Sequence, residues 1–426
     1  MKDLFKFIKN SPSPFHAASE IKKRLAAAGF TELDEYSSYE LAGGGKYFTT
    51  RNDSAVIAFE LPKGKPDGFH IIAAHDDSPA FKIKEEMNMC ANPYVKLNVE
   101  KYGGMILSTW FDRPLGVAGR VMVKTKNGLE SRLYESSKDL VMIPSLAIHM
   151  ERDINDGHKY QVQKELMPIF GNEKADFKEF LADELKVKAE DIYGSDLFVY
   201  NRQEPSVWGD KDQFVSAPKL DDLECVYCAL CGFIAAKPQN QINVLAIFDN
   251  EEVGSGTKQG ADSTFLSDTL ERMVQAIGIE KDGYHRMLAS SLMISADNAH
   301  GMHPNYPEKA DETNRPYLNE GIVIKYNANQ KYTTDAVSGA AFKLICEKAK
   351  VPYQSFTNRS DMAGGSTLGN ISNSQVSVNT VDIGLAQWAM HSSYESAGAK
   401  DIDYLVKAAK TFYSVNLIKT KEGWNC

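Results

Sequence analysis

Residues 243–257 read NVLAIFDNEEVGSGT and carry the clearest fold signal in the chain. The apolar run Asn243–Phe248 ends abruptly in acidic residues, including Glu251 and Glu252, and a turn rich in glycine and serine follows. A short, continuous apolar run bounded by turn residues indicates a strand that is buried on both faces, as in a sheet covered by helices. Ligands bind at the carboxyl ends of strands in open α/β sheets. We therefore expect both glutamates to lie at the edge of a sheet, beside a site.

Helices and strands alternate on either side of this run. Helical patterns occur at about 222–236, 256–277, 335–348 and 401–418, and strand patterns occur at 55–61, 69–74, 292–295, 321–326 and 375–382. Near the N-terminus, Ser13 and Pro14 begin a further helix that ends at Gly29. This alternation predicts an α/β fold with a central mixed sheet flanked by helices.

The segment between about residues 92 and 216 has a different texture. It contains short β-like runs, many turn residues and a helical stretch rich in Glu and Lys at 173–184. A domain tolerates an insertion where the two ends of the inserted segment lie close together at the surface. We therefore predict a discontinuous catalytic domain made of residues 1–91 and 217–426, and an inserted β-rich domain made of residues 92–216.

Composition excludes several classes of protein. Among 426 residues, 57 are acidic and 48 are basic, which gives a net charge of −9, and no Lys/Arg block is present that could neutralise phosphates. Nucleic acid is therefore not an expected partner. The longest apolar runs are too short to cross a bilayer, and the N-terminus lacks the apolar core of a secretory signal. The sequence predicts a cytoplasmic protein without a membrane partner.

Six cysteines are too few for a disulfide scaffold in a chain of this length. Cys225, Cys228 and Cys231 are spaced three residues apart, a pattern that also occurs in metal-binding knuckles. The run around them is apolar and ends in glycine, so the thiols share one face of a helix. We expect them to pack in the core as small apolar groups.

Imidazole and carboxylate side chains stand at the ends of several predicted strands and at one helix start. His75 comes directly after an apolar strand. Asp77, two residues later, can accept a hydrogen bond from the second ring nitrogen of His75, as in carboxylate–histidine–metal arrangements. Asp221 and Asp222 open a predicted helix. Asp222 is expected to cap that helix, and Asp221 is the better metal-ligand candidate.

Two further candidates follow later strands. Asp297 stands just after the strand at 292–295, and His391 follows the strand at 375–382 and a turn. His300 and His303 succeed Asp297 at a spacing that also suits a ligand set. We rank these two histidines below Asp297 as ligands.

Together these positions supply two imidazoles and three carboxylates, with one more carboxylate as a base. Two neighbouring divalent ions need such a set, with one bridging carboxylate and with one histidine and one carboxylate on each metal. Mixed nitrogen and oxygen ligands without thiolate suit Zn²⁺, with Co²⁺ or Mn²⁺ as alternatives. Because Glu251 and Glu252 are adjacent, their side chains point in different directions, so one can bind metal while the other takes a proton. The predicted chemistry is hydrolysis by a metal-bridging water.

Seven strings occur in order along the chain: HDDSP, KLDD, FDNEEVGS, SADNAHGMHPNY, KYNANQKY, SDMAGGSTLG and AMHSSYE. Their order and content resemble the aspartyl aminopeptidase family of dinuclear zinc aminopeptidases, which includes vacuolar aminopeptidase I. The resemblance covers essentially the whole chain and implies an enzyme that hydrolyses the N-terminal residue of peptides. Two departures, Asp222 where Asn is frequent and Asn370 where Pro is frequent, touch no proposed ligand.

The resemblance implies a role for each candidate at the centre. Two metal sites would share one carboxylate, the first consisting of His75, Asp221 and Asp297 and the second of Asp221, Glu252 and His391. Glu251 would be the general acid/base, and Asp77 would orient His75.

The resemblance also implies substrate contacts and an assembly. Lys325 and Tyr332 would contact the substrate, although without the resemblance a solvated lysine and a strand aromatic would be the simpler interpretation. A cationic Lys325 would favour an N-terminal Asp or Glu, and members of the family differ between acidic and apolar preferences. The inserted domain would form dimers that build a homododecamer, and His149 would reach a neighbouring subunit's active site.

Two other functions stay open on the sequence alone. One is a related dinuclear metallohydrolase that cleaves non-peptide amides, which would turn over N-acyl rather than aminoacyl substrates. The other is a catalytically silent assembly protein of the same fold, which would have lost a ligand or the base. No such loss is seen in the sequence.

Overall fold

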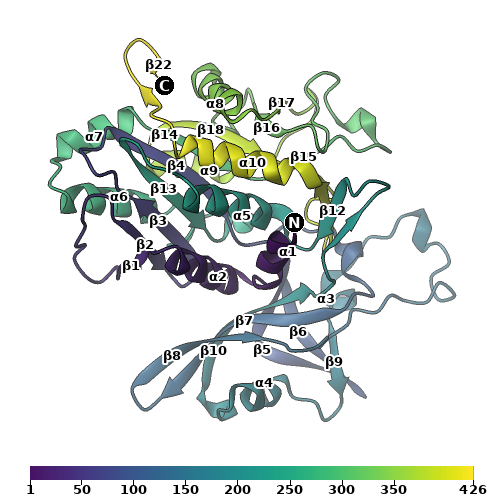
Figure 1. Ribbon diagram of the computed structural model, residues 1–426. Helices are drawn as coiled ribbons and strands as arrows, with labels where there is room; N and C mark the ends of the chain where they lie inside the picture. The colour runs from purple at the N-terminus through teal and green to yellow at the C-terminus, as the bar shows by residue number, and fades with distance from the viewer. Residues whose placement is uncertain (426) are drawn as a thin grey trace.

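A nine-stranded sheet forms the centre of the larger part of the protein in the computed structural model, which describes residues 1–425 (Figure 1). In spatial order its strands are β1 (Thr31–Glu32), β2 (Lys46–Arg51), β3 (Ala55–Glu60), β13 (Gln241–Phe248), β4 (Gly68–His75), β14 (Leu292–Ala296), β18 (Asn379–Gly384), β16 (Ile322–Lys325) and β17 (Tyr353–Phe356). Strands β13, β4, β14 and β18 are parallel, whereas β3 is antiparallel to β13 and β16 to β18. The predicted α/β fold with a central mixed sheet is confirmed.

Helices cover both faces of this main sheet (Figure 1). One core contains side chains of α1 (Lys2–Lys9), α2 (Pro14–Ala27), α5 (Leu220–Ile234), α8 (Ala336–Ala349) and α10 (Ala399–Phe412), and the other contains side chains of α6 (Phe265–Ala276), α7 (Lys281–Ala289) and α9 (Leu368–Gln375). Along β13, Leu245 and Ile247 pack in the first core, and Val244, Ala246 and Phe248 pack in the second. Because both faces of β13 are buried, its sequence is apolar throughout instead of alternating.

The cysteines of α5 occupy the core, as predicted. Cys225 and Cys228 are fully buried, and Cys231 packs against the same cluster of apolar side chains. The three-residue spacing therefore reflects one buried face of a helix.

A second, antiparallel sheet of six strands has an apolar core of its own and lies apart from the main sheet (Figure 1). In spatial order its strands are β8 (Gly128–Glu135), β7 (Leu115–Thr125), β10 (Ile192–Asn201), β5 (Ala80–Ala91), β6 (Tyr94–Tyr102) and β9 (Ile169–Asn172), and it is accompanied by α3 (Val162–Glu165) and α4 (Phe177–Leu185). We call residues 80–201 the insert. The sheet takes in β5, which the sequence assigned to the catalytic domain, and the predicted boundary at residue 92 falls in the turn between β5 and β6.

A third sheet connects the return of the chain to the loops that follow the main strands. Its strands are β11 (Ser206–Trp208), β12 (Phe214–Ala217), β20 (Glu395–Gly398), β19 (Ala386–Trp388) and β15 (Ala299–His300). The segments around Asp297 and His391 are therefore tied together by β15, β19 and β20. A short hairpin of β21 (Ile418–Lys419) and β22 (Trp424–Asn425) follows α10.

Most of the predicted elements lie within a few residues of their expected bounds, with three exceptions. The helix expected at 256–277 begins only at Phe265, because residues 254–264 form turns in which a Cβ on Gly260 would overlap the backbone of Ser255. The strand expected at 375–382 begins at Asn379, after α9 has ended, and the helix expected to reach residue 418 ends at Phe412. Within residues 1–425, no helix is both long and apolar enough to span a membrane.

Candidate metal centre

The five predicted ligands meet at the carboxyl edge of the main sheet. His75 ends β4, and Asp221 stands at the start of α5. Glu252 is in the 3₁₀ turn η4 (Glu251–Val253) after β13, Asp297 directly follows β14, and His391 lies in the loop between β19 and β20. Because β13, β4 and β14 are parallel neighbours, residues that follow them necessarily lie side by side.

The side chains form two overlapping groups that share Asp221, and a third group joins His75 and Glu252 to Glu251. Ligand atoms of His75, Asp221 and Asp297 all lie within 4.8 Å of one another, and so do those of Asp221, Glu252 and His391. Asp221 Oδ1 is 3.6 Å from His75 Nε2, and Asp221 Oδ2 is 3.3 Å from His391 Nε2. The two oxygens of one carboxylate therefore face two different imidazoles.

These distances fit bound metal ions. Ligand atoms about 2.1 Å from a tetrahedral cation lie about 3.4 Å apart. The separations around Asp221, together with 3.4 Å between His391 Nε2 and Glu252 Oε2, agree with this value. Among the described residues, Asp221 Oδ1 and Glu252 Oε1 are buried without a hydrogen-bond partner, which is unfavourable unless a cation is nearby. The donor set of imidazole nitrogen and carboxylate oxygen suits zinc.

The charges of the centre are unbalanced without cations. Burial raises the pKa of Glu251 to about 7, and the charge of Asp297 adds to this effect. Burial also holds the pKa of Glu252 well above its usual range. For Asp221, burial is outweighed by the imidazoles of His391 and His75, which lower its pKa. Bound cations would lower the pKa of all these carboxyls and allow them to ionise together.

Asp77 contacts more groups than the sequence predicted. Its Oδ1 lies 3.3 Å from His75 Nδ1, as expected for a residue that orients this imidazole. The same carboxylate also accepts hydrogen bonds from the N–H groups of Glu251 and Glu252, both at 3.1 Å, and from the hydroxyl of Tyr102 at 2.6 Å. Asp77 therefore holds the turn that presents both glutamates, and Tyr102 joins the insert to this centre.

Lys325 and Tyr332 lie beside the centre and are both buried. Lys325 Nζ is 3.3 Å from Asp297 Oδ1, donates to the carbonyl of Asn298 at 2.7 Å and lies 5.4 Å from the ring centroid of Tyr332. The simpler interpretation, a solvated lysine and a strand aromatic, is wrong, because Lys325 is only 2% exposed and Tyr332 lies between β16 and α8 rather than in a strand.

Three other candidates lie outside the groups of possible ligands found in residues 1–425. His149 is in an exposed turn of the insert. His300 packs edge-on to Phe356, and His303 Nδ1 accepts a hydrogen bond from the N–H of Asn305.

Asp222 does not have the predicted capping role. Its Oδ2 accepts a hydrogen bond from the N–H of His75 at 3.3 Å, across the centre, because the backbone at Asp221 and Asp222 is not helical. The side chain therefore supports the end of β4 and does not close the first turn of α5.

Comparisons with known proteins agree along the whole chain. The family model described as aminopeptidase I zinc metalloprotease (M18) matches residues 7–413. The chain is 48% identical to a protein of Clostridium acetobutylicum named probable M18 family aminopeptidase 2, over 97% of this chain and 98% of that protein. The fold is similar to Ape4 in the cryo-EM structure of its complex with Nbr1, with a TM-score of 0.94 and 34% identity over 97% of this chain and 85% of that one. It is also similar to the S. cerevisiae mApe1 dodecamer, with a TM-score of 0.86 and 27% identity over 97% of this chain and 95% of that one.

Proposed function

The chain belongs to the aminopeptidase I zinc metalloprotease (M18) family and is a metal-dependent aminopeptidase, and from this premise we propose that it works with two divalent cations on either side of Asp221. His75 and Asp297 would complete the first site, and Glu252 and His391 the second. The observation that carries the proposal is that the two oxygens of Asp221 face different imidazoles, at 3.6 and 3.3 Å. Zn²⁺ is the proposed ion, and Co²⁺ or Mn²⁺ would fit the same ligands.

The reaction is hydrolysis of the bond that follows the first residue of a peptide. When bound, the two cations would supply a water of lowered pKa as nucleophile and positive charge opposite the developing oxyanion. Glu251 stands in the same turn as Glu252 and belongs to neither of the two ligand groups that share Asp221. One of its oxygens lies within 4.8 Å of ligand atoms of His75 and Glu252, so its carboxylate is close enough to approach this water. Its carboxylate would take a proton from the water and pass it to the leaving amine.

Exchange of Glu251 for Gln tests the assignment of the base. Glu251→Gln should retain both metal ions and lose about 10²- to 10⁴-fold in kcat, because it removes the proton acceptor alone. The matched control is Glu252→Gln, one residue away, which should lose metal as well as activity. Near-normal turnover by metal-loaded Glu251→Gln would exclude Glu251 as the general acid/base.

Lys325 and Tyr332 are proposed to contact the side chain of the substrate's first residue. A lysine ammonium has three N–H donors. In the described residues two of them have partners, Asp297 and the carbonyl of Asn298, so one donor is left for a substrate carboxylate. Such a contact would favour peptides that begin with Asp or Glu.

The proposed assembly is a homododecamer built from dimers that the insert forms. The turn that carries His149 is exposed, and it displays the apolar side chains of Leu146, Ile148 and Met150, which are 52%, 48% and 75% exposed. Exposed apolar groups gathered in one segment are typical of an interface. His149 would then enter the active site of a neighbouring subunit in a cytoplasmic particle. A native mass of twelve chains, and loss of activity without loss of metal in His149→Ala, would support this arrangement, whereas an active monomer would exclude it.

A further inference from the structure

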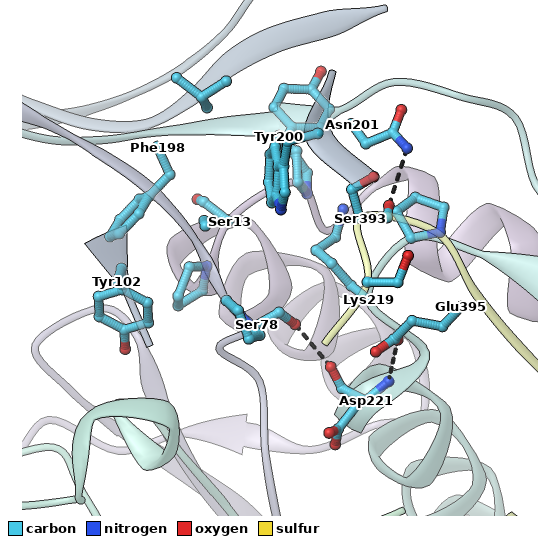
Figure 2. Close-up of a pocket in the computed structure, with 18 of the residues that line it drawn as sticks. Ser13, Ser78, Tyr102, Phe198, Tyr200, Asn201, Lys219, Asp221, Ser393 and Glu395 are labelled. Carbon is cyan, nitrogen blue, oxygen red and sulfur yellow. Dashed lines mark hydrogen bonds between the residues drawn. The ribbon is translucent and has the colours of Figure 1, made fainter. Parts of the chain in front are cut away.

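Glu395 connects the backbones of two proposed ligands that are far apart in sequence. Its Oε2 accepts a hydrogen bond from the N–H of Asp221 at 2.9 Å, and its Oε1 accepts one from the N–H of His391 at 2.7 Å. Figure 2 shows the bond to Asp221, together with the bond that Ser78 Oγ donates to the carbonyl of Asp221 at 2.9 Å. One buried carboxylate is therefore hydrogen-bonded to the main chain of both the shared aspartate and a histidine of the second site.

One of the two backbones held in this way, that of His391, has an unfavourable conformation for a residue other than glycine. His391 has a φ of 66°, in the left-handed region that favours glycine. Asp221 has φ −80° and ψ 108°, which is not helical although it stands at the start of α5. Unfavourable backbone conformations persist where surrounding contacts determine them, and they are concentrated at functional sites.

Glu395 is buried, but it belongs to none of the possible metal-ligand groups among the described residues. The side chain is only 2% exposed. Its partners are N–H donors: the two amides and, at 3.5 Å, Gln387 Nε2. A buried carboxylate is costly unless hydrogen bonds and nearby positive charge compensate for it. Cations next to Asp221 would supply that charge.

Glu395 is connected to the region of Asp297 only through a chain of hydrogen bonds, which begins at Gln387. Gln387 Oε1 accepts a hydrogen bond from Asn298 Nδ2 at 2.9 Å, and the carbonyl of Asn298 accepts one from Lys325, the residue beside Asp297. Its direct bonds go to two ligands of the second site and to only one of the first. Disturbing Glu395 should therefore affect the second site more.

We infer that Glu395 is a positioning residue, which holds Asp221 and His391 at the separation that the second cation requires. The inference rests on the two-cation function proposed above. It assigns to Glu395 no contact with substrate or metal. Its effect is transmitted through the main-chain N–H groups of the ligands.

Glu395→Gln tests this role, because it preserves the size of the side chain but turns an NH₂ group toward a backbone N–H. The full-length protein, freed of metal, would be titrated with Co²⁺ while visible absorption and competition with a chromophoric chelator report the two stepwise affinities. The affinity for the second ion should fall about 10- to 100-fold, as for other residues that orient metal ligands, and that for the first ion should fall much less. Saturating Co²⁺ should restore most of kcat, which it would not do if the variant were simply misfolded.

Two further variants separate positioning from general stability and from charge. Glu224→Gln changes another fully buried glutamate of the same network, which accepts from Asn298 Nδ2 at 3.1 Å, and it should leave both Co²⁺ affinities within about twofold of wild type. Glu395→Asp keeps the charge but is one methylene too short to span both amides, so its second-ion affinity should also fall. It also serves as the test should Glu395→Gln not fold.

The outcomes distinguish this role from the function on which it rests. If wild-type protein takes up two Co²⁺ ions and Glu395→Gln binds both as tightly, the positioning role is overturned alone. The same conclusion follows if Glu395→Asp is indistinguishable from wild type, because charge would then suffice, or if Glu224→Gln shows an equal loss. Failure of the wild-type chain to bind a second ion would instead overturn the two-cation proposal.

Discussion

Asp77 offers the most quantitative test of how the centre is supported. Its carboxylate serves four groups: the imidazole of His75, the N–H groups of Glu251 and Glu252, and the hydroxyl of Tyr102. In Asp77→Asn the carbonyl oxygen can still accept from one glutamate N–H. The NH₂ group replaces Oδ2, which in wild type accepts from the N–H of Glu252 and from the hydroxyl of Tyr102.

The cost follows from the bonds that are lost. A hydrogen bond to a charged acceptor contributes about 1.5 kcal/mol, so losing two gives about 3 kcal/mol, or about 100-fold. If the Tyr102 hydroxyl turns and accepts from the new NH₂ group, only one bond is lost and the expected effect is about tenfold. We expect Asp77→Asn to lower zinc affinity, measured by chelator competition, or kcat/KM at saturating zinc, by a factor in this range.

Tyr102→Phe is the matched control, because it leaves both glutamate amides satisfied and removes only the bonds of one hydroxyl: the 2.6 Å bond to Asp77 and the 2.8 Å bond that Asn250 Nδ2 donates to it. Tyr102→Phe should lower zinc affinity or kcat/KM by tenfold or less. Asp77→Asn within twofold of wild type in both measurements would refute the supporting role. A larger effect of Tyr102→Phe than of Asp77→Asn would contradict the order of the contributions.

Three further outcomes are expected. In Lys325→Met, assayed at saturating metal, the kcat/KM for peptides that begin with Asp, divided by that for peptides that begin with Leu, should fall by about tenfold or more, because a charge-assisted contact is lost. An unchanged ratio would show that Lys325 does not determine specificity. Gly384→Ala should destabilise the protein by about 1–3 kcal/mol in thermal melts and weaken zinc binding in titrations, because the new Cβ would overlap the carbonyl oxygen of Asp297. Gly64 has open space around it, so Gly64→Ala should change neither stability nor zinc affinity. His158 Nε2 is 2.7 Å from Glu165 Oε2 and its Nδ1 is 2.5 Å from Glu151 Oε1, and these carboxylates raise the pKa of His158. Its stabilisation of the segment between β8 and α3 is therefore complete below the ordinary histidine pKa and is lost as pH rises through the raised pKa. Proteolysis of this segment should accelerate over that pH interval in wild type, and an equal pH dependence in His158→Gln would contradict the assignment.

The sequence predicted the parts of the centre that side-chain patterns encode. His75, Glu252 and Asp297 each follow an apolar strand, and parallel strands bring their carboxyl ends to one edge. Asp221 was found from its place at a helix start, and the core position of the α5 cysteines from helical spacing. These inferences rest on local periodicity, which a single sequence displays.

The contacts that the sequence did not predict are made to backbone atoms or between distant segments. Glu395 and Asp77 act on main-chain N–H groups, which have no signature in residue type. The pairing of Lys325 with Asp297 depends on β16 and β14 lying near each other in the sheet. The start of the insert's sheet was placed too late because β5 alternates buried and exposed residues and lacks the continuous apolar run of the buried strands.

The pair of metal ions on either side of Asp221 is the central claim, and anomalous diffraction from a crystal grown with zinc tests it most directly. Two peaks at the zinc absorption edge should flank this carboxylate, one contacted by His75 and Asp297 and the other by Glu252 and His391. A single peak, or peaks that do not touch Asp221, would contradict the account.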